Sequence, residues 1–242
     1  MIRLENFSIG YGRRTLLDNV STGVRTGELT ALIGRNGTGK STLLRAIAGL
    51  NPAYSGNIYL DGNNLRSLKP NQLARTLSLV TTERTRVAAL RCRDVVAIGR
   101  APYTNWIGSM QPQDREIVMQ SLEAVGMADY ADRTMDRMSD GECQRVMIAR
   151  ALAQDTPIIL LDEPTSFLDI PNRHQLCHLL ARLAHDRSKA ILFSTHELDL
   201  ALRLTDRILL IAPPDLHNLP SADPSTLPQI RQTFSLPPDA LA

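Results

Sequence analysis

A segment with the composition of a phosphate-binding loop lies near the N-terminus. Residues 34–41 read Gly-Arg-Asn-Gly-Thr-Gly-Lys-Ser, which fits the spacing G-x-x-x-x-G-K-[ST]. In such a loop the glycines let consecutive backbone N–H groups curl round a phosphate, and the positive end of the following helix points toward it. Lys40 would reach the outer phosphates, and the Ser41 hydroxyl would ligate Mg²⁺. The segment therefore predicts binding of a nucleoside triphosphate.

The flanking residues support this interpretation. The apolar run 29–33 predicts a buried strand, and residues 42–50 predict the start of a helix. A strand–loop–helix context separates a working phosphate loop from a chance match. The alternative, a glycine-rich turn capped by a serine, does not require that context.

A pair of adjacent acids follows a second apolar run. Asp162 and Glu163 come directly after Leu160 and Leu161. A carboxylate at the tip of a core strand suits a second Mg²⁺ contact, and the next acid could polarise an attacking water as a general base. Without the phosphate loop upstream, helix capping before Pro164 would explain the pair equally well.

Short apolar runs separated by helical patterns predict the fold class. Residues 2–9 and 15–24 predict an N-terminal antiparallel sheet, and residues 112–153 have a helical pattern. Further buried strands are expected at residues 77–80, 158–161, 190–193 and 207–211. This alternation is typical of an α/β protein with a mostly parallel sheet covered by helices.

The composition limits the possible partners. The formal net charge of +2 gives no argument for nucleic acid, and the three cysteines lack the spacing of a zinc site or a disulfide framework. No apolar run approaches the 18 residues that a membrane helix needs, and we expect no signal peptide at the N-terminus. A membrane role would therefore require a partner.

The last 30 residues differ from the rest, because they hold seven of the chain's 14 prolines. Such a density disfavours long strands and helices, so we expect a largely irregular tail with a short helical turn over residues 227–234.

Three further segments carry a family resemblance. They are Met138-Ser139-Asp140-Gly141-Glu142-Cys143-Gln144-Arg145, Ser166-Phe167-Leu168-Asp169, and His196 at a strand exit. Together with the phosphate loop and the acidic pair, they resemble the nucleotide-binding domains of ABC transporters over about residues 2–212. The resemblance implies a P-loop NTPase core (about 1–82 and 155–212), with an N-terminal antiparallel β subdomain. It also implies an inserted helical subdomain (about 83–154) and an appended tail (213–242).

The resemblance also implies roles for single residues. Lys40, Glu163 as the base and His196 as the γ-phosphate switch would be catalytic, and Ser41, Asp162 and Thr82 would lie at Mg²⁺. Contacts to ATP are implied for Tyr11, Gly34, Arg35, Asn36, Gly37, Thr38, Gly39, Lys40, Ser41, Thr42, Ser139, Gly141, Glu142 and Asp169. Ser139 and Gly141 would cover the ATP of a second copy, so catalysis would need a head-to-tail dimer. Alternatives remain: Tyr11 also fits an ordinary turn, His196 a structural role and Ser139 a helix cap.

The chain departs from the family pattern at two positions. Asp140 replaces the usual first glycine of the signature segment, and Thr82 replaces the glutamine that ligates Mg²⁺ in the family. Glu83 could supply a charged oxygen instead. The Thr82 departure questions the coupling to the metal and leaves nucleotide binding unaffected. Asp140 would place an acid near a γ-phosphate, which is unfavourable unless the carboxylate points away or meets a cation such as a neighbouring arginine.

Two further charged patterns have simpler explanations. Arg84, Arg86, Arg91, Arg93 and Arg100 predict a solvated basic face, or alternatively a contact with a membrane partner. The case for nucleic-acid binding by this segment is weak, because no aromatic residues alternate with the arginines before Tyr103 and Trp106. His174, His178 and His185 form one helical stripe opposite leucines, which predicts a solvent face.

We therefore expect the ATPase subunit of an ABC importer, resembling those that serve iron–siderophore, haem or cobalamin uptake. Its partners would be a second copy, membrane permease subunits and, indirectly, a substrate-binding protein, with no nucleic acid. It would lie at the cytoplasmic face of the membrane. The alternative is a soluble ABC ATPase acting in iron–sulfur assembly, on the ribosome or on DNA. A small-molecule kinase would leave residues 138–145 and His196 unexplained.

Overall fold

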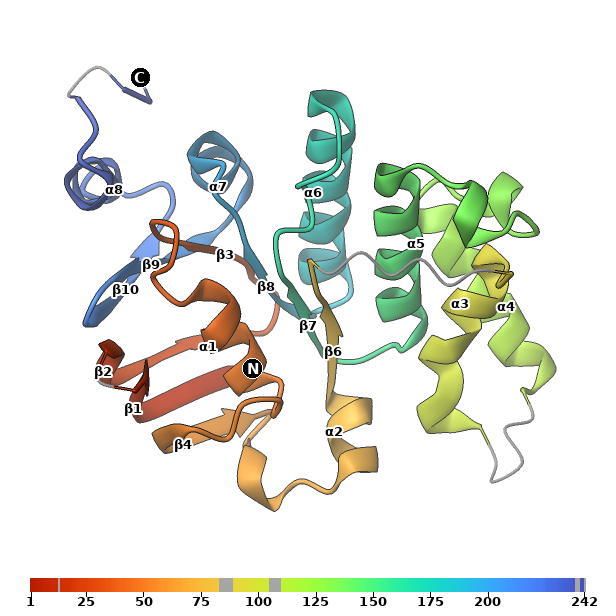
Figure 1. Cartoon of the computed structure of the whole chain (residues 1–242), viewed down its shortest axis with the longest axis horizontal. Helices are drawn as coiled ribbons and strands as arrows, with labels where there is room; N and C mark the ends of the chain where they lie inside the picture. The colour runs from red at the N-terminus through yellow and green to blue at the C-terminus, as the bar shows by residue number, and fades with distance from the viewer. Residues whose placement is uncertain (13, 83–88, 105–109, 238–239, 242) are drawn as a thin grey trace.

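The computed structural model of the protein describes residues 1–12, 14–82, 89–104, 110–237 and 240–241. Its central sheet (Figure 1) has the strand order β10-β9-β3-β8-β7-β6. These strands are β3 (Leu29–Ile33), β6 (Leu77–Val80), β7 (Ile158–Leu161), β8 (Ala190–Ser194), β9 (Arg207–Ala212) and β10 (Asp215–Pro220). Every neighbouring pair is parallel except β9 with β10. The predicted mostly parallel sheet is confirmed.

A second sheet is formed mainly by the N-terminal residues. It is antiparallel, with the order β2-β1-β4-β5. Its strands are β1 (Ile2–Tyr11), β2 (Arg14–Val24), β4 (Tyr54–Leu60) and β5 (Asn63–Asn64). Between β4 and β5, Asp61 and Gly62 have φ values of 49° and 83°, as a tight turn with two left-handed residues requires.

Helices cover both faces of the central sheet and divide the apolar residues into two cores. The helices are α1 (Lys40–Ile47), α2 (Pro70–Thr76), α3 (Cys92–Ala97), α4 (Pro112–Ala124), α5 (Asp140–Ala153), α6 (Ile170–Asp186), α7 (Leu198–Leu204) and α8 (Thr226–Phe234). Short 3-10 turns occur at Leu65–Ser67, Ile98–Tyr103, Ala128–Tyr130 and Met135–Arg137. Because side chains alternate along a strand, Leu32 and Leu160 face α1 and the second sheet. Ala31 and Ile159 belong to the other core, beneath α5, α6 and α7.

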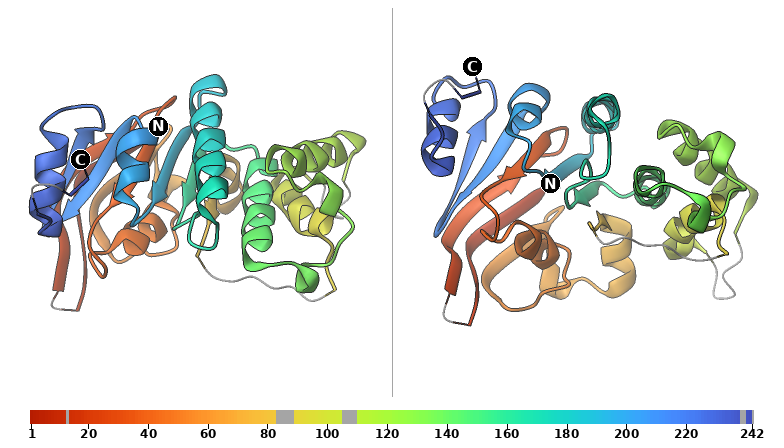
Figure 2. Two further views of the ribbon diagram at one scale, coloured as in Figure 1. Left: turned by 90° about the horizontal axis from the view of Figure 1, so that it is seen from above. Right: turned by 45° about the horizontal axis from the view of Figure 1, so that its top comes forward.

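Helices α3, α4 and α5 form a lobe beyond the β6 edge (Figures 1 and 2). Within it, Arg100 is not part of a solvated basic face, and that prediction was wrong for this residue. Its side chain is 8% exposed, its Nε lies 2.9 Å from Asp114 Oδ1, and its Nη1 donates to the Ala153 carbonyl. Arg91 and Arg93 are half-exposed and pair with Asp132. Arg84, Arg86 and Trp106 lie outside the described residues.

The C-terminal segment is more ordered than its proline content suggests, so the expectation of a largely irregular tail was wrong. The helical turn expected over residues 227–234 is confirmed as α8. Its prolines avoid the interiors of its elements. Pro220 ends β10, an edge strand, where a missing N–H costs little. Pro228 lies in the first turn of α8, where the N–H groups have no helical partner. The helix is anchored by Ile230, which is fully buried.

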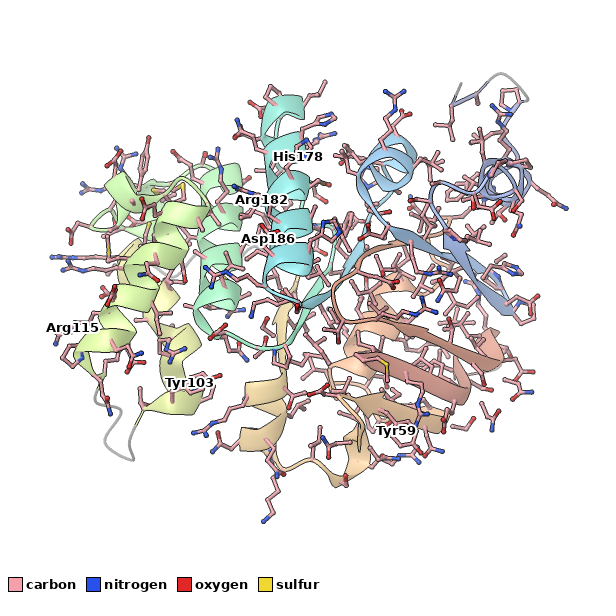
Figure 3. The ribbon with its side chains drawn as sticks, turned by 180° about the vertical axis from the view of Figure 1, so that it is seen from behind. Tyr59, Tyr103, Arg115, His178, Arg182 and Asp186 are labelled. Carbon is pink, nitrogen blue, oxygen red and sulfur yellow. The ribbon has the colours of Figure 1, made fainter. Side chains whose placement is uncertain are left out.

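The outward face of α6 carries the predicted histidine stripe. His174, His178 and His185 are exposed, which confirms that prediction. Figure 3 shows His178 on the same side of α6 as Arg182 and Asp186. His185 Nε2 lies 2.9 Å from Asp206 Oδ2, so the last histidine of the stripe pairs on the surface. Within the described part of the chain, no helix combines the length and apolar character needed to span a membrane.

Candidate functional site

The phosphate loop joins β3 to α1 and leaves the amides of the helix start open. Gly39 is the N-cap residue, with φ of 102°, and no side chain of the described residues caps the helix. Such a left-handed conformation favours glycine. Gly34 is restricted by space instead, since an added Cβ would lie 2.7 Å from Thr38 Oγ1. A helix start with free amides attracts an anion.

Lys40 lies inside this loop and is 7% exposed. Its Nζ donates to the Gly34 carbonyl at 2.9 Å. Burial lowers the pKa of Lys40, and the carboxylates of Glu163 and Asp162 oppose that shift. The ammonium group is therefore held at the mouth of the loop by a neutral carbonyl, which a phosphate oxygen would outcompete.

Other loop residues have structural and exposed positions. Thr38 donates from both its N–H and its Oγ1 to the Arg35 carbonyl, which closes the loop. Ser41 is exposed at the second helical position. The Thr42 hydroxyl lies 3.4 Å from the Tyr11 hydroxyl. Tyr11 is therefore linked to the helix while 60% exposed, as a stacking surface would be. Arg35, Asn36 and Gly37 are exposed along the loop.

The acidic pair lies at the end of β7, beside the end of β8. The two strands pair Leu161 with Phe193, so the next residues, Asp162 and Ser194, are adjacent. Ser194 Oγ donates to Asp162 Oδ1 at 2.6 Å and accepts from the Glu163 N–H at 2.8 Å. One hydroxyl thus orients the Asp162 carboxylate and fixes the backbone of Glu163. Asp162 is only 6% exposed, which suits a metal-side carboxylate with a fixed orientation.

Glu163 turns its side chain toward His196. The φ of Glu163 is 48°, a left-handed conformation that is uncommon for a residue with a side chain. Ser166 Oγ donates to Glu163 Oε2 at 3.1 Å, and His196 Nδ1 lies 3.8 Å from the same oxygen. The imidazole is more than half exposed, so it can reach a ligand in the open site. This contact favours the functional interpretation of His196 over a purely structural one.

Thr82 reaches the same edge of the sheet from β6. Its Oγ1 donates to the Asp162 carbonyl at 3.1 Å. The Thr82 hydroxyl therefore donates its proton to the backbone of the acidic pair. Glu83, the suggested substitute, lies outside the described residues.

The signature residues form a separate group at the start of α5. Ser139 and Glu142 make a reciprocal cap: the Ser139 N–H donates to Glu142 Oε2 at 2.8 Å, and the Glu142 N–H donates to Ser139 Oγ at 3.3 Å. The Ser139 N–H holds the pKa of Glu142 below its usual range. At Gly141 an added Cβ would lie 2.9 Å from the Phe167 carbonyl oxygen, so α5 packs closely on the segment before Asp169. Asp169 in turn caps α6 by accepting from the Asn172 N–H.

The structure thus divides the expected site residues into two groups. The phosphate loop, Asp162, Glu163, His196 and Thr82 meet at the carboxyl ends of the central strands, where ligands of open α/β sheets bind. The start of α5 lies across β7 and α6 from α1 (Figure 1). Within one chain, the start of α5 packs on the segment before Asp169 and lies apart from the phosphate loop.

Sequence reasoning missed four residues that support the site: Ser194, Thr165, Arg173 and Glu197. Ser194 had a usable signal, since it is a polar residue at the end of a strand that is otherwise apolar. Thr165, Arg173 and Glu197 had none, because their contacts join segments that are distant in the sequence.

Comparison with known proteins agrees with this geometry. Residues 17–166 match the family model described as ABC transporter. The chain is 42% identical to the uncharacterised ABC transporter ATP-binding protein MJ0873 of Methanocaldococcus jannaschii, over 87% of this chain and 73% of the relative. It is 35% identical to the iron(3+)-hydroxamate import ATP-binding protein FhuC of Bacillus subtilis, over 83% and 75%. It is 34% identical to the ferric enterobactin transport ATP-binding protein FepC of Escherichia coli, over 86% and 77%.

Solved structures extend the comparison to the whole fold. One is an inward-facing ABC transporter described as of the metal-chelate type, at a TM-score of 0.85 and 26% identity, covering 98% of this chain and 89% of the other. Another is the ATP-binding cassette MJ0796 as a dimer after hydrolysis, bound to ADP and Pi. It has a TM-score of 0.80 and 26% identity, and 92% and 100% of the two chains are covered.

The chain belongs to the ABC transporter family, in which it is an ATP-binding, ATP-hydrolysing subunit. The resemblance inferred from residues 138–145 and 166–169 is therefore confirmed, and a small-molecule kinase is excluded.

Proposed function

We propose that this chain is the ATPase that drives uptake of an iron complex, a siderophore or haem, or of cobalamin, through a membrane permease. The observation that carries the proposal is the cluster at the strand ends, where buried Lys40 and the oriented acids Asp162 and Glu163 lie beside an uncapped helix start. The similarity to FhuC, an iron(3+)-hydroxamate import protein, and to FepC, a ferric enterobactin transport protein, supports the choice of cargo.

In the proposed site the phosphate loop holds the triphosphate. Residues 34–42 offer backbone amides, and Lys40 exchanges the Gly34 carbonyl for a phosphate oxygen. Tyr11 stacks on the adenine from its exposed position next to Thr42. Glu163 accepts the proton of the attacking water, and His196 contacts the γ-phosphate from its position near Glu163 Oε2.

The donor set fits Mg²⁺. Mg²⁺ prefers oxygen ligands and usually takes one or two from the protein beside phosphates and waters. The exposed Ser41 hydroxyl and the buried Asp162 carboxylate, oriented by Ser194, supply such oxygens. Bound there, the ion would neutralise charge on the phosphates. Thr82 would support the backbone of Asp162 and not donate to the ion's ligands, because its hydroxyl donates to the Asp162 carbonyl.

Two copies close head to tail in the proposed cycle. Ser139, Gly141 and Glu142 of one copy cover the ATP held by the other, and Asp169 lies in the segment that faces the partner. Residues of about 83–154 form the helical subdomain and those of about 1–82 and 155–212 the catalytic core. The segment 213–242 is an appendage fixed to the core through β10 and α8. The permease holds this dimer at the cytoplasmic face of the membrane.

Reconstitution with a permease tests the proposal. The chain should co-purify with a polytopic membrane protein, and vesicles holding both should take up a ferric siderophore, haem or cobalamin only when ATP is present. A Glu163→Gln chain should bind the permease without supporting uptake. Recovery with a soluble ribosomal or DNA complex, and without a membrane protein, would contradict the importer assignment.

A further inference from the structure

Glu197, the residue after His196, joins three segments of the site through one carboxylate. Its Oε1 accepts from Thr165 Oγ1 at 2.7 Å, and its Oε2 accepts from Arg173 Nη1 at 2.9 Å. Thr165 is 1% exposed, and the side chains of Arg173 and Glu197 are 30% and 16% exposed. Hydrogen bonds to charged groups in such partly buried positions are short and strong compared with neutral ones.

Each of the three segments carries a residue with a proposed role. Thr165 lies two positions after Glu163, in the loop that follows β7. Arg173 lies four positions after Asp169, and its Nε also donates to the Leu168 carbonyl at 2.7 Å. One guanidinium therefore grips both the Asp169 segment and Glu197.

The position of Glu197 is not explained by helix capping. Glu197 occupies the N-cap position of α7, yet its side chain makes no capping hydrogen bond. Its own N–H donates to Thr195 Oγ1 at 3.0 Å. The residues preferred at an N-cap are Ser, Thr, Asp and Asn, whose side-chain oxygen accepts a hydrogen bond from a backbone N–H of the first helical turn. Here both carboxylate oxygens point to other segments instead.

We propose that Glu197 is a positioning residue that holds the His196, Glu163 and Asp169 segments in one fixed arrangement, so that dimer closure sensed near Asp169 aligns the base and the switch histidine. This inference rests on the proposed head-to-tail dimer. In this proposal Glu197 contacts other side chains and not the nucleotide. It acts on the rate of hydrolysis through its neighbours and leaves nucleotide affinity to the phosphate loop.

Glu197→Gln gives the direct test, because it keeps the shape and can still accept from Thr165 while the charge that holds Arg173 is lost. We expect kcat to fall about 10- to 100-fold, as small misplacements of catalytic groups do. The Kd for ATP, measured with a fluorescent ATP analogue, should stay within about twofold, since the phosphate loop is unchanged. Arg173→Lys, which cannot grip Leu168 and Glu197 together, should give an intermediate loss.

A double variant and a matched control separate positioning from folding. Arg173→Met should cost less when added to Glu197→Gln than it does alone, because the contact with Glu197 is already weakened and mainly the contact with the Leu168 carbonyl remains to be lost. Asp155→Asn breaks the Lys189–Asp155 pair, also 2.9 Å long but remote from the site, and should leave kcat unchanged.

The outcomes distinguish the two proposals. If the unmodified chain neither binds nor hydrolyses ATP, the proposed function fails. If it does both, and Glu197→Gln keeps its kcat or loses kcat and ATP affinity in parallel, only the positioning role is overturned. A Glu197→Gln chain that does not fold leaves Arg173→Lys to decide in the same way.

Discussion

The starts of α1 and α5 are both helix N-termini assigned to ATP, yet their local chemistry is opposite. At α1 a left-handed glycine precedes the helix, and no described side chain caps it. At α5 the Ser139 hydroxyl and the Glu142 carboxylate satisfy each other and the first amides. The first end is ready for an anion by itself. At the second, the Ser139 hydroxyl already donates to Glu142, so a phosphate must displace that internal contact to accept from it.

This difference explains why one chain alone would bind nucleotide without completing the site. Binding to open amides requires no rearrangement, whereas the Ser139 hydroxyl must turn away from Glu142 Oε2 to donate to a phosphate. The cost of that exchange favours the second contact only after the first has fixed the triphosphate. We therefore expect nucleotide binding at α1 to precede dimer closure.

The largest effect is expected at the α1 end. Lys40→Ala removes the buried cation of the loop. ATP binding and turnover should both be abolished, because the phosphates lose their nearest cation. Binding is measured with a fluorescent ATP analogue and turnover by phosphate release. Lys189→Ala, at a lysine that pairs with Asp155, is the control and should bind ATP normally. A Lys40→Ala chain with unchanged affinity for ATP would show that the backbone amides of the phosphate loop suffice to bind the triphosphate.

Glu163→Gln should separate binding from chemistry. Turnover should fall roughly 1000-fold, because the amide cannot accept the proton of water, while ATP binding persists. With ATP the variant should accumulate as a dimer, which light scattering can detect. Glu116→Gln, on the exposed face of α4, is the matched control. A Glu163→Gln monomer with normal turnover would refute the assignment of the base.

The α1 end and the strand-end acids could be predicted from sequence because their chemistry is local. The spacing of residues 34–41 and the position of Asp162 after an apolar run are each contained in one short segment. The contacts of Ser194, Thr165 and Glu197 could not be predicted, since they depend on which strands are neighbours in the sheet. That order is a tertiary property without a local signal.

The errors have the same physical origin. Arg100 was expected on a solvated face because arginine usually is exposed, and its burial depends on Asp114 and on a carbonyl at the end of α5. The C-terminal prolines were expected to prevent regular structure. The two that lie within elements, Pro220 and Pro228, occupy the end of an edge strand and a first helical turn, where a missing N–H costs little.

Ser139→Ala tests whether the α5 end acts on a partner. Turnover should fall about 100-fold through loss of one hydroxyl donor, and α5 should lose about 1 kcal/mol from its cap. ATP affinity should be unchanged, because the phosphate loop is intact.

Mixing Ser139→Ala with Lys40→Ala sharpens this test. A mixed dimer has one site with an intact phosphate loop and an intact signature segment. The mixture should therefore regain about a quarter of the normal activity, because half of randomly paired dimers are mixed and each has one good site of two. Lack of any recovery would mean that each chain uses its own signature segment, or that one intact site is insufficient.

The smallest effect is expected from Glu142→Gln, which alters only the charge of the α5 cap. Because the Ser139 N–H lowers the pKa of Glu142, the carboxylate is charged at neutral pH, and its stabilisation of α5 is lost only as the pH falls through that lowered pKa. The side-chain amide introduced by Glu142→Gln keeps the contact with Ser139. It removes a negative charge from the place where a partner's γ-phosphate would approach. Dimerisation with ATP should become about two- to fivefold tighter, the size of one charge at a helix end. Sedimentation of Glu163→Gln dimers with and without this change measures it, and weaker dimerisation would mean that the carboxylate itself helps to hold the partner.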